Sequence, residues 1–141
     1  MLARPTVLIA DDEEVMRSAL IELLDGEELH VVGEAGDGSE AVSLAQRLDP
    51  DVVLMDLRMP LMDGIEAAER IKRQMPFVQV VMYSAYADLA LEEASQAAGV
   101  YCYLIKGSPA KFVRDILIQA ASYRIGLEAQ ARDGRQMTAL P

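Results

Sequence analysis

The chain has 141 residues, of which 52% are hydrophobic and 26% are charged, and its formal net charge is −10 at pH 7. This length fits one domain with one core, and this composition excludes wholesale disorder. An acidic surface repels nucleic-acid phosphates and anionic lipid, so we expect no direct nucleic-acid binding by this domain and no membrane association.

Cysteine and histidine are too scarce for two common kinds of structural site. Cys102 is the only cysteine and His30 the only histidine, which excludes an intrachain disulfide and a Cys/His zinc site. Only four apolar residues, Val7 to Ala10, precede the first aspartates, which is too short for a signal peptide. No apolar run approaches the ~18 residues of a membrane span. We therefore expect a cytoplasmic protein.

Short apolar runs and amphipathic stretches alternate along the first half of the chain. In order, they predict a strand at residues 7–10, a helix at 15–24, a strand at 30–34 and a helix at 38–48. The helices are recognised by apolar residues at helical spacing on one side. Their ends are marked by Gly26 and by Asp49-Pro50, which do not continue a helix.

The second half repeats this alternation. It predicts a strand at 52–55, a helix at 65–75, a strand at 78–83, a helix at 88–98, a strand at 100–105 and a last helix from 108 onward. Tyr101 and Tyr103 alternate with Cys102, so both are expected on one face of the last strand. Ser108 is expected to cap the last helix, with Pro109 as its first residue.

The apolar period of the last helix fades after about Gly126. We therefore predict a domain at residues 1–125, followed by a frayed helix end or a linker tail at residues 126–141. Five strand–helix units with buried strands predict an α/β fold, in which helices cover both faces of a parallel sheet. Right-handed crossovers favour the flavodoxin-like (βα)5 doubly wound sheet with strand order 2-1-3-4-5.

In such a sheet, the working site lies beyond the carboxyl ends of the strands. These ends carry Asp11 and Asp12 after the first strand, Asp56 after the third, Ser84 after the fourth and Lys106 after the fifth. Three carboxylates in one cleft repel one another, and a hard cation with oxygen ligands, such as Mg2+, relieves that repulsion. With a lysine and a hydroxyl beside them, they predict a site for phosphoryl transfer to an aspartate.

Each of these residues also has an ordinary structural interpretation. Asp11 and Glu14 could form a helix capping pair, and Asp56 could be a turn residue. Ser84 could be a strand-end hydroxyl, and Lys106 could be a solvated surface charge. Capping and solvation, however, do not predict an acid pair, an acid, a hydroxyl and a lysine on successive strand ends. The joint arrangement therefore favours the phosphoryl-transfer site.

Three segments resemble the receiver domains of two-component response regulators: residues 7–13 (VLIADDE), 51–64 (DVVLMDLRMPLMDG) and 103–106 (YLIK). The resemblance covers roughly residues 6–122. Residues 32–42 (VGEAGDGSEAV) and 106–109 (KGSP) are most similar to receivers of the NarL/FixJ subfamily. Those proteins usually carry a helix-turn-helix domain after a linker, and this sequence contains none. The resemblance thus implies a stand-alone receiver or the N-terminal part of a transcriptional regulator.

The resemblance also implies a role for each site residue. Asp56 is the phosphoacceptor, phosphorylated in a Mg2+-dependent reaction by a sensor histidine kinase or a small phosphodonor. Asp12 and Asp56 bind Mg2+ together with the main-chain oxygen of Arg58, and Asp11 does so directly or through water. Lys106 pairs with the carboxylate and then with the phosphoryl oxygens.

The implied switch involves two further residues. Ser84 reorients to bond the phosphoryl group, and Tyr103 follows by turning inward. This movement alters the face formed by the fourth helix, the fifth strand and the fifth helix. Because Ser84 gains a strong acceptor only in the phosphorylated state, phosphorylation biases a pre-existing equilibrium toward the altered face. Family members form homodimers through this face or through the first and fifth helices, so a homodimer is a possible assembly. Arg58 and Tyr86 resemble the positions that set the lifetime of the phosphoryl group.

One departure from the family concerns the residue after the lysine. Family members often have a proline there, with a cis peptide bond, whereas this chain has Gly107. A cis bond before a non-proline residue costs about 2.5–4 kcal/mol, so the sequence leaves the Lys106–Gly107 isomer open.

Two other functions share part of this pattern. A phosphatase of the haloacid-dehalogenase type also uses an aspartyl nucleophile and Mg2+, but it needs an acid two residues later, where this chain has Arg58. A pseudo-receiver scaffold would keep the fold without phosphorylation, and the complete set of site residues disfavours it. We therefore predict a phosphoacceptor domain and no enzyme, with self-phosphorylation and autodephosphorylation as its only reactions.

Overall fold

A computed structural model describes residues 4–139, with side chains over residues 4–134. The strands are β1 (Thr6–Ala10), β2 (His30–Ala35), β3 (Val52–Asp56), β4 (Gln79–Ser84) and β5 (Cys102–Ile105). The helices are α1 (Glu14–Leu24), α2 (Gly38–Leu48), α3 (Gly64–Gln74), α4 (Leu89–Ala97) and α5 (Ala110–Ala139). Strands and helices alternate in the predicted order, and their bounds differ from the predicted ones by a few residues at most, except at the end of α5.

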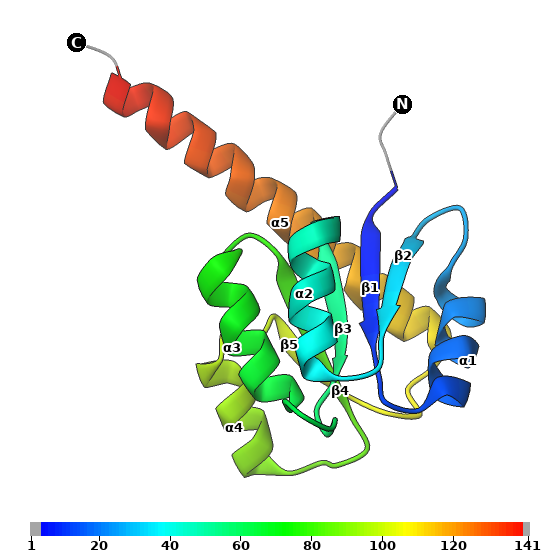
Figure 1. Ribbon diagram of the computed structural model, residues 1–141. Helices are drawn as coiled ribbons and strands as arrows, with labels where there is room; N and C mark the ends of the chain where they lie inside the picture. The colour runs from blue at the N-terminus through cyan, green and yellow to red at the C-terminus, as the bar shows by residue number, and fades with distance from the viewer. Residues whose placement is uncertain (1–3, 140–141) are drawn as a thin grey trace.

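The five strands form one parallel sheet in the order β2-β1-β3-β4-β5, so the predicted flavodoxin-like fold is confirmed. Every residue of β3 and of β4 is buried, as the uninterrupted apolar run of residues 52–55 predicts for strands covered on both faces. Figure 1 shows the sheet between its two layers of helices.

Each face of the sheet has its own core. Residues of α2 and α3, including Ala41, Ala45 and Ile71, pack on one face, and residues of α1 and α5, including Leu24 and Leu117, pack on the other. Small alanines on α2 and α3 let these helices lie close to the sheet. The sheet is therefore held from both sides, and its strand ends are fixed relative to one another.

Aspartates begin three of the helices. The side chains of Asp37, Asp63 and Asp88 accept hydrogen bonds of 2.8–3.1 Å from the backbone N–H three residues later, which satisfies one otherwise free donor at each helix start. These caps fix where α2, α3 and α4 start. Helices α3 and α4 follow the loops that leave the carboxyl ends of β3 and β4.

The last helix departs from two predictions. Ser108 does not cap it: its hydroxyl donates to the carbonyl of Ile105 at 2.7 Å, and the helix begins at Ala110. The expected cap is one residue too early because Ser108 closes the turn after β5 instead. The helix also continues to Ala139, so residues 126–139 are helical, and the domain division at residue 125 stays a prediction.

The expected shared face of Tyr101 and Tyr103 is wrong. Tyr101 packs with the core under α5, whereas Tyr103 packs with the opposite core. Tyr101 precedes β5, so the alternation of a strand does not apply to it, and its ring lies 5.7 Å from that of Tyr123 on α5. Within the residues described, no helix is both long enough and apolar enough to cross a membrane.

Candidate functional site

The register of the sheet brings two distant aspartates side by side. Ala10 of β1 pairs with Met55 of β3, and the next residues along the two parallel strands are Asp11 and Asp56. Both carboxylates are nearly inaccessible to solvent, at 1% and 7% exposure. Apolar strand residues 45 positions apart thus carry two charged groups into one buried edge of the sheet.

Asp12 completes a cluster of three carboxylates. One oxygen of each of Asp11, Asp12 and Asp56 lies within 4.8 Å of the others, a spacing that can hold a metal ion. Asp11 is fixed by the backbone N–H of Glu13, which donates to its Oδ1 at 2.9 Å. Asp12 is exposed, so the cluster opens to solvent on one side.

Lys106 is the cation of this site. Ser84 of β4 pairs with Ile105 of β5, and the next residue, Lys106, directs its Nζ to Asp11 and to Asp56, at 3.2 Å from an Oδ2 of each. Burial lowers the pKa of Lys106, but the Asp56 and Asp11 carboxylates raise it more, so the ammonium stays charged. The structure therefore brings together the predicted acid pair, acid and lysine.

The negative charge of the three carboxylates is only partly neutralised by Lys106. Burial, which outweighs the opposing effect of Lys106, raises the pKa of Asp56 to about 6, and the charges of Asp11 and Asp12 add to that rise. Three carboxylates face one ammonium group, so the cluster at full ionisation carries an excess of negative charge. An added divalent cation would offset it, and oxygen ligands at this spacing suit a hard cation.

A hollow of about 210 Å³ opens over the cluster. Its lining residues are Asp12, Glu13, Asp56, Arg58, Ala85, Tyr86 and Lys106. The volume lies below the ~300–1,000 Å³ of typical small-molecule sites, and it suits an ion and a small anion better than an extended ligand. A larger hollow of about 380 Å³ lies at the opposite, amino-terminal edge of the sheet and contains none of these groups.

Tyr86 has contacts that the sequence analysis did not predict. The Ser84 hydroxyl accepts a 3.1 Å hydrogen bond from the Tyr86 N–H, and the Tyr103 hydroxyl donates at 2.6 Å to the Tyr86 carbonyl. The Arg58 guanidinium lies 4.8 Å from the centre of the Tyr86 ring. Both predicted switch residues thus bond the main chain of one tyrosine, which no sequence pattern could reveal because the bonds are to backbone atoms.

The loop after Asp56 folds tightly onto the strand end. The Gly64 N–H donates to the Leu57 carbonyl at 2.7 Å, and a Cβ at position 64 would overlap the Asp56 carbonyl oxygen. Only glycine fits this close approach. The loop is thereby closed against β3, and Arg58 reaches the hollow.

Glu13, which also lines the hollow, is a site residue that the sequence analysis did not single out, although it directly follows the acid pair.

The structure settles the isomer of the peptide bond after Lys106, which the sequence left open. The Lys106–Gly107 bond is trans, and Gly107 has a φ of 97°, a conformation that favours glycine.

The sequence matches the family described as "Response regulator receiver domain" over residues 7–118. The transcriptional regulatory protein PdtaR of Mycobacterium tuberculosis is 47% identical over 102 residues, which cover 71% of this chain and 48% of that relative. The transcriptional regulatory protein LiaR of Bacillus subtilis is 38% identical over 125 residues, 88% of this chain and 59% of that relative.

Solved structures agree with these relatives. The response regulator domain of CheB from Thermotoga maritima has 31% identity and a TM-score of 0.79, covering 85% of this chain and 98% of that one. The signal receiver domain of NarL from Mycobacterium tuberculosis has 29% identity and a TM-score of 0.82, covering 86% and 98%. This chain spans about half the length of the curated relatives named above, at 48% and 59%. The chain belongs to the response regulator receiver domains of two-component signalling.

Proposed function

We propose that this domain accepts a phosphoryl group on Asp56 from a sensor histidine kinase and passes on a change of surface. The observation that carries the proposal is the position of Lys106, whose ammonium contacts Asp11 and Asp56 at 3.2 Å within the carboxylate cluster. A carboxylate that accepts a phosphoryl group needs a nearby cation to neutralise the incoming oxygens.

The carboxylate cluster fits Mg2+. Asp11, Asp12 and Asp56 supply oxygen atoms within 4.8 Å of one another, and the family resemblance adds the main-chain oxygen of Arg58. When bound, the ion would neutralise negative charge on the carboxylates and on the transferred phosphoryl group. The raised pKa of Asp56, which is caused mainly by burial and partly by the neighbouring carboxylates, is the strain that a cation would relieve.

In the proposed reaction, an ionised Asp56 oxygen attacks the phosphorus of the donor. A P–O bond to Asp56 forms, and the bond from phosphorus to the donor breaks, a P–N bond in the case of a phosphohistidine. The donor leaves with the electron pair. Lys106 then shifts its contact from the carboxylate to a phosphoryl oxygen, while its bond to Asp11 keeps the ammonium in place.

The switch is proposed to begin at Ser84. A phosphoryl oxygen on Asp56 offers the Ser84 hydroxyl a strong acceptor, and the hydroxyl would leave the Tyr86 N–H to reach it. Tyr103, which bonds the Tyr86 carbonyl, would respond to the same loop movement. Arg58 and Tyr86, which stack beside Asp56, are proposed to shield it from water and to lengthen the lifetime of the phosphoryl group.

The whole protein is proposed to act in transcriptional control. The relatives are described as transcriptional regulatory proteins, and this chain covers about half of their length. Any DNA contact would then belong to a further domain, because the receiver carries a net charge of −10. A stand-alone receiver that switches a protein partner, or a homodimer, is the other form of the same proposal.

Phosphorylation is tested with Mg2+ and acetyl phosphate or carbamoyl phosphate. Wild-type protein is expected to gain one acid-stable, alkali-labile phosphate by mass spectrometry. Asp56→Asn is expected to gain none. Asp115→Asn, which changes an aspartate on α5 outside the cluster, is the matched control and should gain one phosphate. Absence of phosphate on wild type contradicts the proposal and favours a scaffold, whereas a phosphate on Asp56→Asn places the acceptor elsewhere.

The same samples test for an enzyme. Turnover of many equivalents of a phosphate ester, beyond the slow consumption of the phosphodonor itself, would indicate a phosphatase. Arg58 offers no acid two residues after Asp56, so we expect no such turnover.

A further inference from the structure

Helix α5 is the longest element and extends well past the sheet. It begins near the carboxylate edge, crosses one face, and continues beyond the amino-terminal ends of the strands, as Figure 1 shows from yellow to red. Val113, Leu117 and Ala120 pack it against the core. The residues that follow, 125–139, are called the arm here, and none of its residues with described side chains, 125–134, belongs to that core.

Arg124 lies where the arm leaves the body. Among the residues with described side chains, it is the only arginine or lysine that is buried, at 8% exposure. Its guanidinium donates to the Pro50 carbonyl at 2.6 Å and to both carboxylate oxygens of Asp49 at 2.9 and 3.1 Å. A further N–H reaches Glu128, one turn along the arm, at 2.5 Å.

These contacts join the arm to a rigid part of the fold. Asp49 and Pro50 connect α2 to β3, and the neighbouring Asp51 holds the start of β1 through 2.9–3.1 Å hydrogen bonds with Thr6. A single guanidinium nitrogen, Nη2, contacts both Asp49 oxygens, while Nη1 and Nε bond Pro50 and Glu128. One planar group thus donates charge-assisted hydrogen bonds to three residues, an arrangement that a lysine ammonium cannot reproduce. Arg124 therefore connects the arm to the α2–β3 connection and, through Asp51 and Thr6, to the amino-terminal end of β1.

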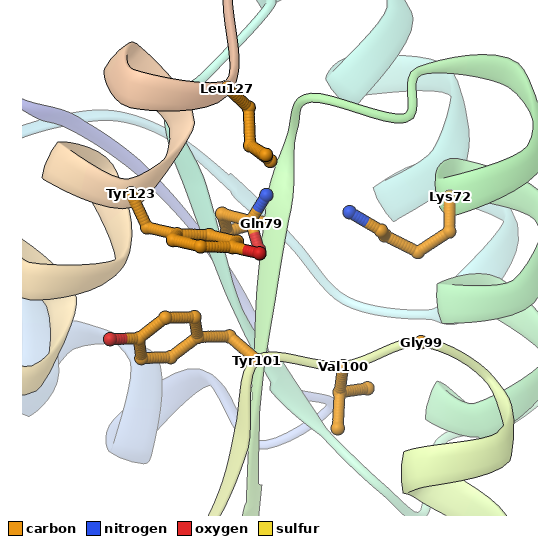
Figure 2. Close-up of a pocket in the computed structure, with 7 residues that line it drawn as sticks. All are labelled: Lys72, Gln79, Gly99, Val100, Tyr101, Tyr123 and Leu127. Atoms are coloured by element: carbon orange, nitrogen blue, oxygen red, sulfur yellow. The ribbon is translucent and has the colours of Figure 1, made fainter. Parts of the chain in front are cut away.

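The opposite side of the helix is attached more weakly. The Tyr123 ring lies 5.7 Å from the Tyr101 ring, and Tyr123 is 52% exposed. Figure 2 shows Leu127 above Gln79, the Tyr123 ring at the level of Gln79 and Tyr101 below, all lining an open hollow. This side adds contact area but no charge-assisted hydrogen bond between the helix and the body among the residues described. The attachment of the arm to the body consequently depends mainly on Arg124.

The arm is a poor helix by itself. It contains Gly126 and Gly134, neither of which would contact anything within 4 Å through an added Cβ, so neither glycine is required for packing. Each costs about 1 kcal/mol relative to alanine in a helix interior. Propagation of α5 beyond the body needs no new nucleus, but each added residue gains little free energy in water, so two glycines make the helical arm marginal. The helical state of the arm thus needs support from the body.

We propose that Arg124 is a clamp that decides whether the arm is a helix or a linker. With the clamp closed, α5 is one rigid rod that starts beside the carboxylate site and leaves from the far edge of the sheet. With the clamp open, the helix ends near Ala121 and the arm becomes a flexible connection. The core contacts of α5 before Ala121 do not involve the clamp, so the body keeps its fold in both states.

Amide hydrogen exchange on the whole chain tests the clamp. In Arg124→Met, which keeps the apolar stem and loses the guanidinium, the amides of residues 126–134 should exchange at least about tenfold faster, since charge-assisted bonds of this kind are lost. Amides of β1 and β3 should stay protected. Arg132→Met, which removes an exposed arginine farther along the arm, is the matched control and should change exchange less than about threefold.

Two results would overturn the clamp. One is unchanged protection of residues 126–134 in Arg124→Met, and the other is equal loss in Arg124→Met and Arg132→Met. If Arg124→Met fails to fold, Asp49→Asn serves instead. Asp49 has a φ of 46°, which asparagine adopts readily, so this variant removes the charge without backbone strain. Partial loss of protection in the arm supports the clamp, and wild-type protection in this variant contradicts it.

Discussion

Asp56 is a charged residue placed where its charge is unfavourable. It is 7% exposed, and burial together with two neighbouring carboxylates raises its pKa to about 6 in spite of Lys106. The folded state therefore binds a proton more tightly than the unfolded state, whose carboxyl has the ordinary value of 3.8. The resulting stability is fully present below pH 3.8 and is lost as the pH rises through about 6.

Removing this charge should stabilise the metal-free protein. At pH 7.5 with EDTA, we expect Asp56→Asn to raise the free energy of unfolding by roughly 1–3 kcal/mol, because the ionised carboxylate no longer has to be buried. Urea unfolding at pH 7.5 and at pH 4.5 measures the effect, and the gain should shrink at the lower pH. A variant less stable than wild type at pH 7.5 would show that Lys106 compensates Asp56 fully.

At the scale of helices and strands, signals that are local in the chain predicted the helix bounds to within two residues, except at the end of α5. Asp37, Asp63 and Asp88 begin helices because each cap involves residues only three positions apart. The length of α5 could not be predicted this way. Its support comes from Asp49, 75 residues from Arg124 along the chain, and the apolar period that sequence analysis follows is absent in the arm.

Two glycine substitutions separate packing from helix propensity. Gly64→Ala places a Cβ against the Asp56 carbonyl and should lower the free energy of unfolding by about 1–3 kcal/mol, the usual cost of overpacking. In Gly126→Ala the added Cβ meets nothing within 4 Å, so this substitution should raise the free energy of unfolding by about 0.5–1 kcal/mol and increase the helix content of the arm. Urea unfolding and circular dichroism measure both. Equal effects of the two substitutions would contradict the tight closure of the loop after Asp56.

At the scale of the whole molecule, the fold could be predicted because many weak signals agree. Five alternations of strand and helix leave few topologies, and in a doubly wound sheet the functional groups must lie at the carboxyl ends. The positions of Asp11, Asp56 and Lys106 follow from this rule and from the register of β1, β3 and β5. The contacts of Tyr86 and Arg124 do not follow, because they join side chains to backbone atoms or to distant loops.

Mg2+ should stabilise the whole domain by binding only the folded cluster. At about 100 times its dissociation constant, a ligand specific for the folded state adds ~2.7 kcal/mol. Thermal unfolding with MgCl2 should show a rise in Tm that NaCl of equal ionic strength does not give. Asp12→Asn, which changes the exposed member of the cluster, should lose most of that rise. Equal rises in both salts would indicate general screening of the net charge of −10.

The two ends of β3 face opposite directions: Asp56 closes one, and Asp49 and Pro50, which hold Arg124, precede the other. Figure 1 shows the carboxyl ends of the strands and the departing end of α5 on opposite sides of the molecule. A donor protein approaching the carboxylates would therefore meet the side away from the departing helix. Cargo joined to that helix would stand clear of the donor, so loading of the aspartate and engagement of the cargo are sterically compatible within one molecule.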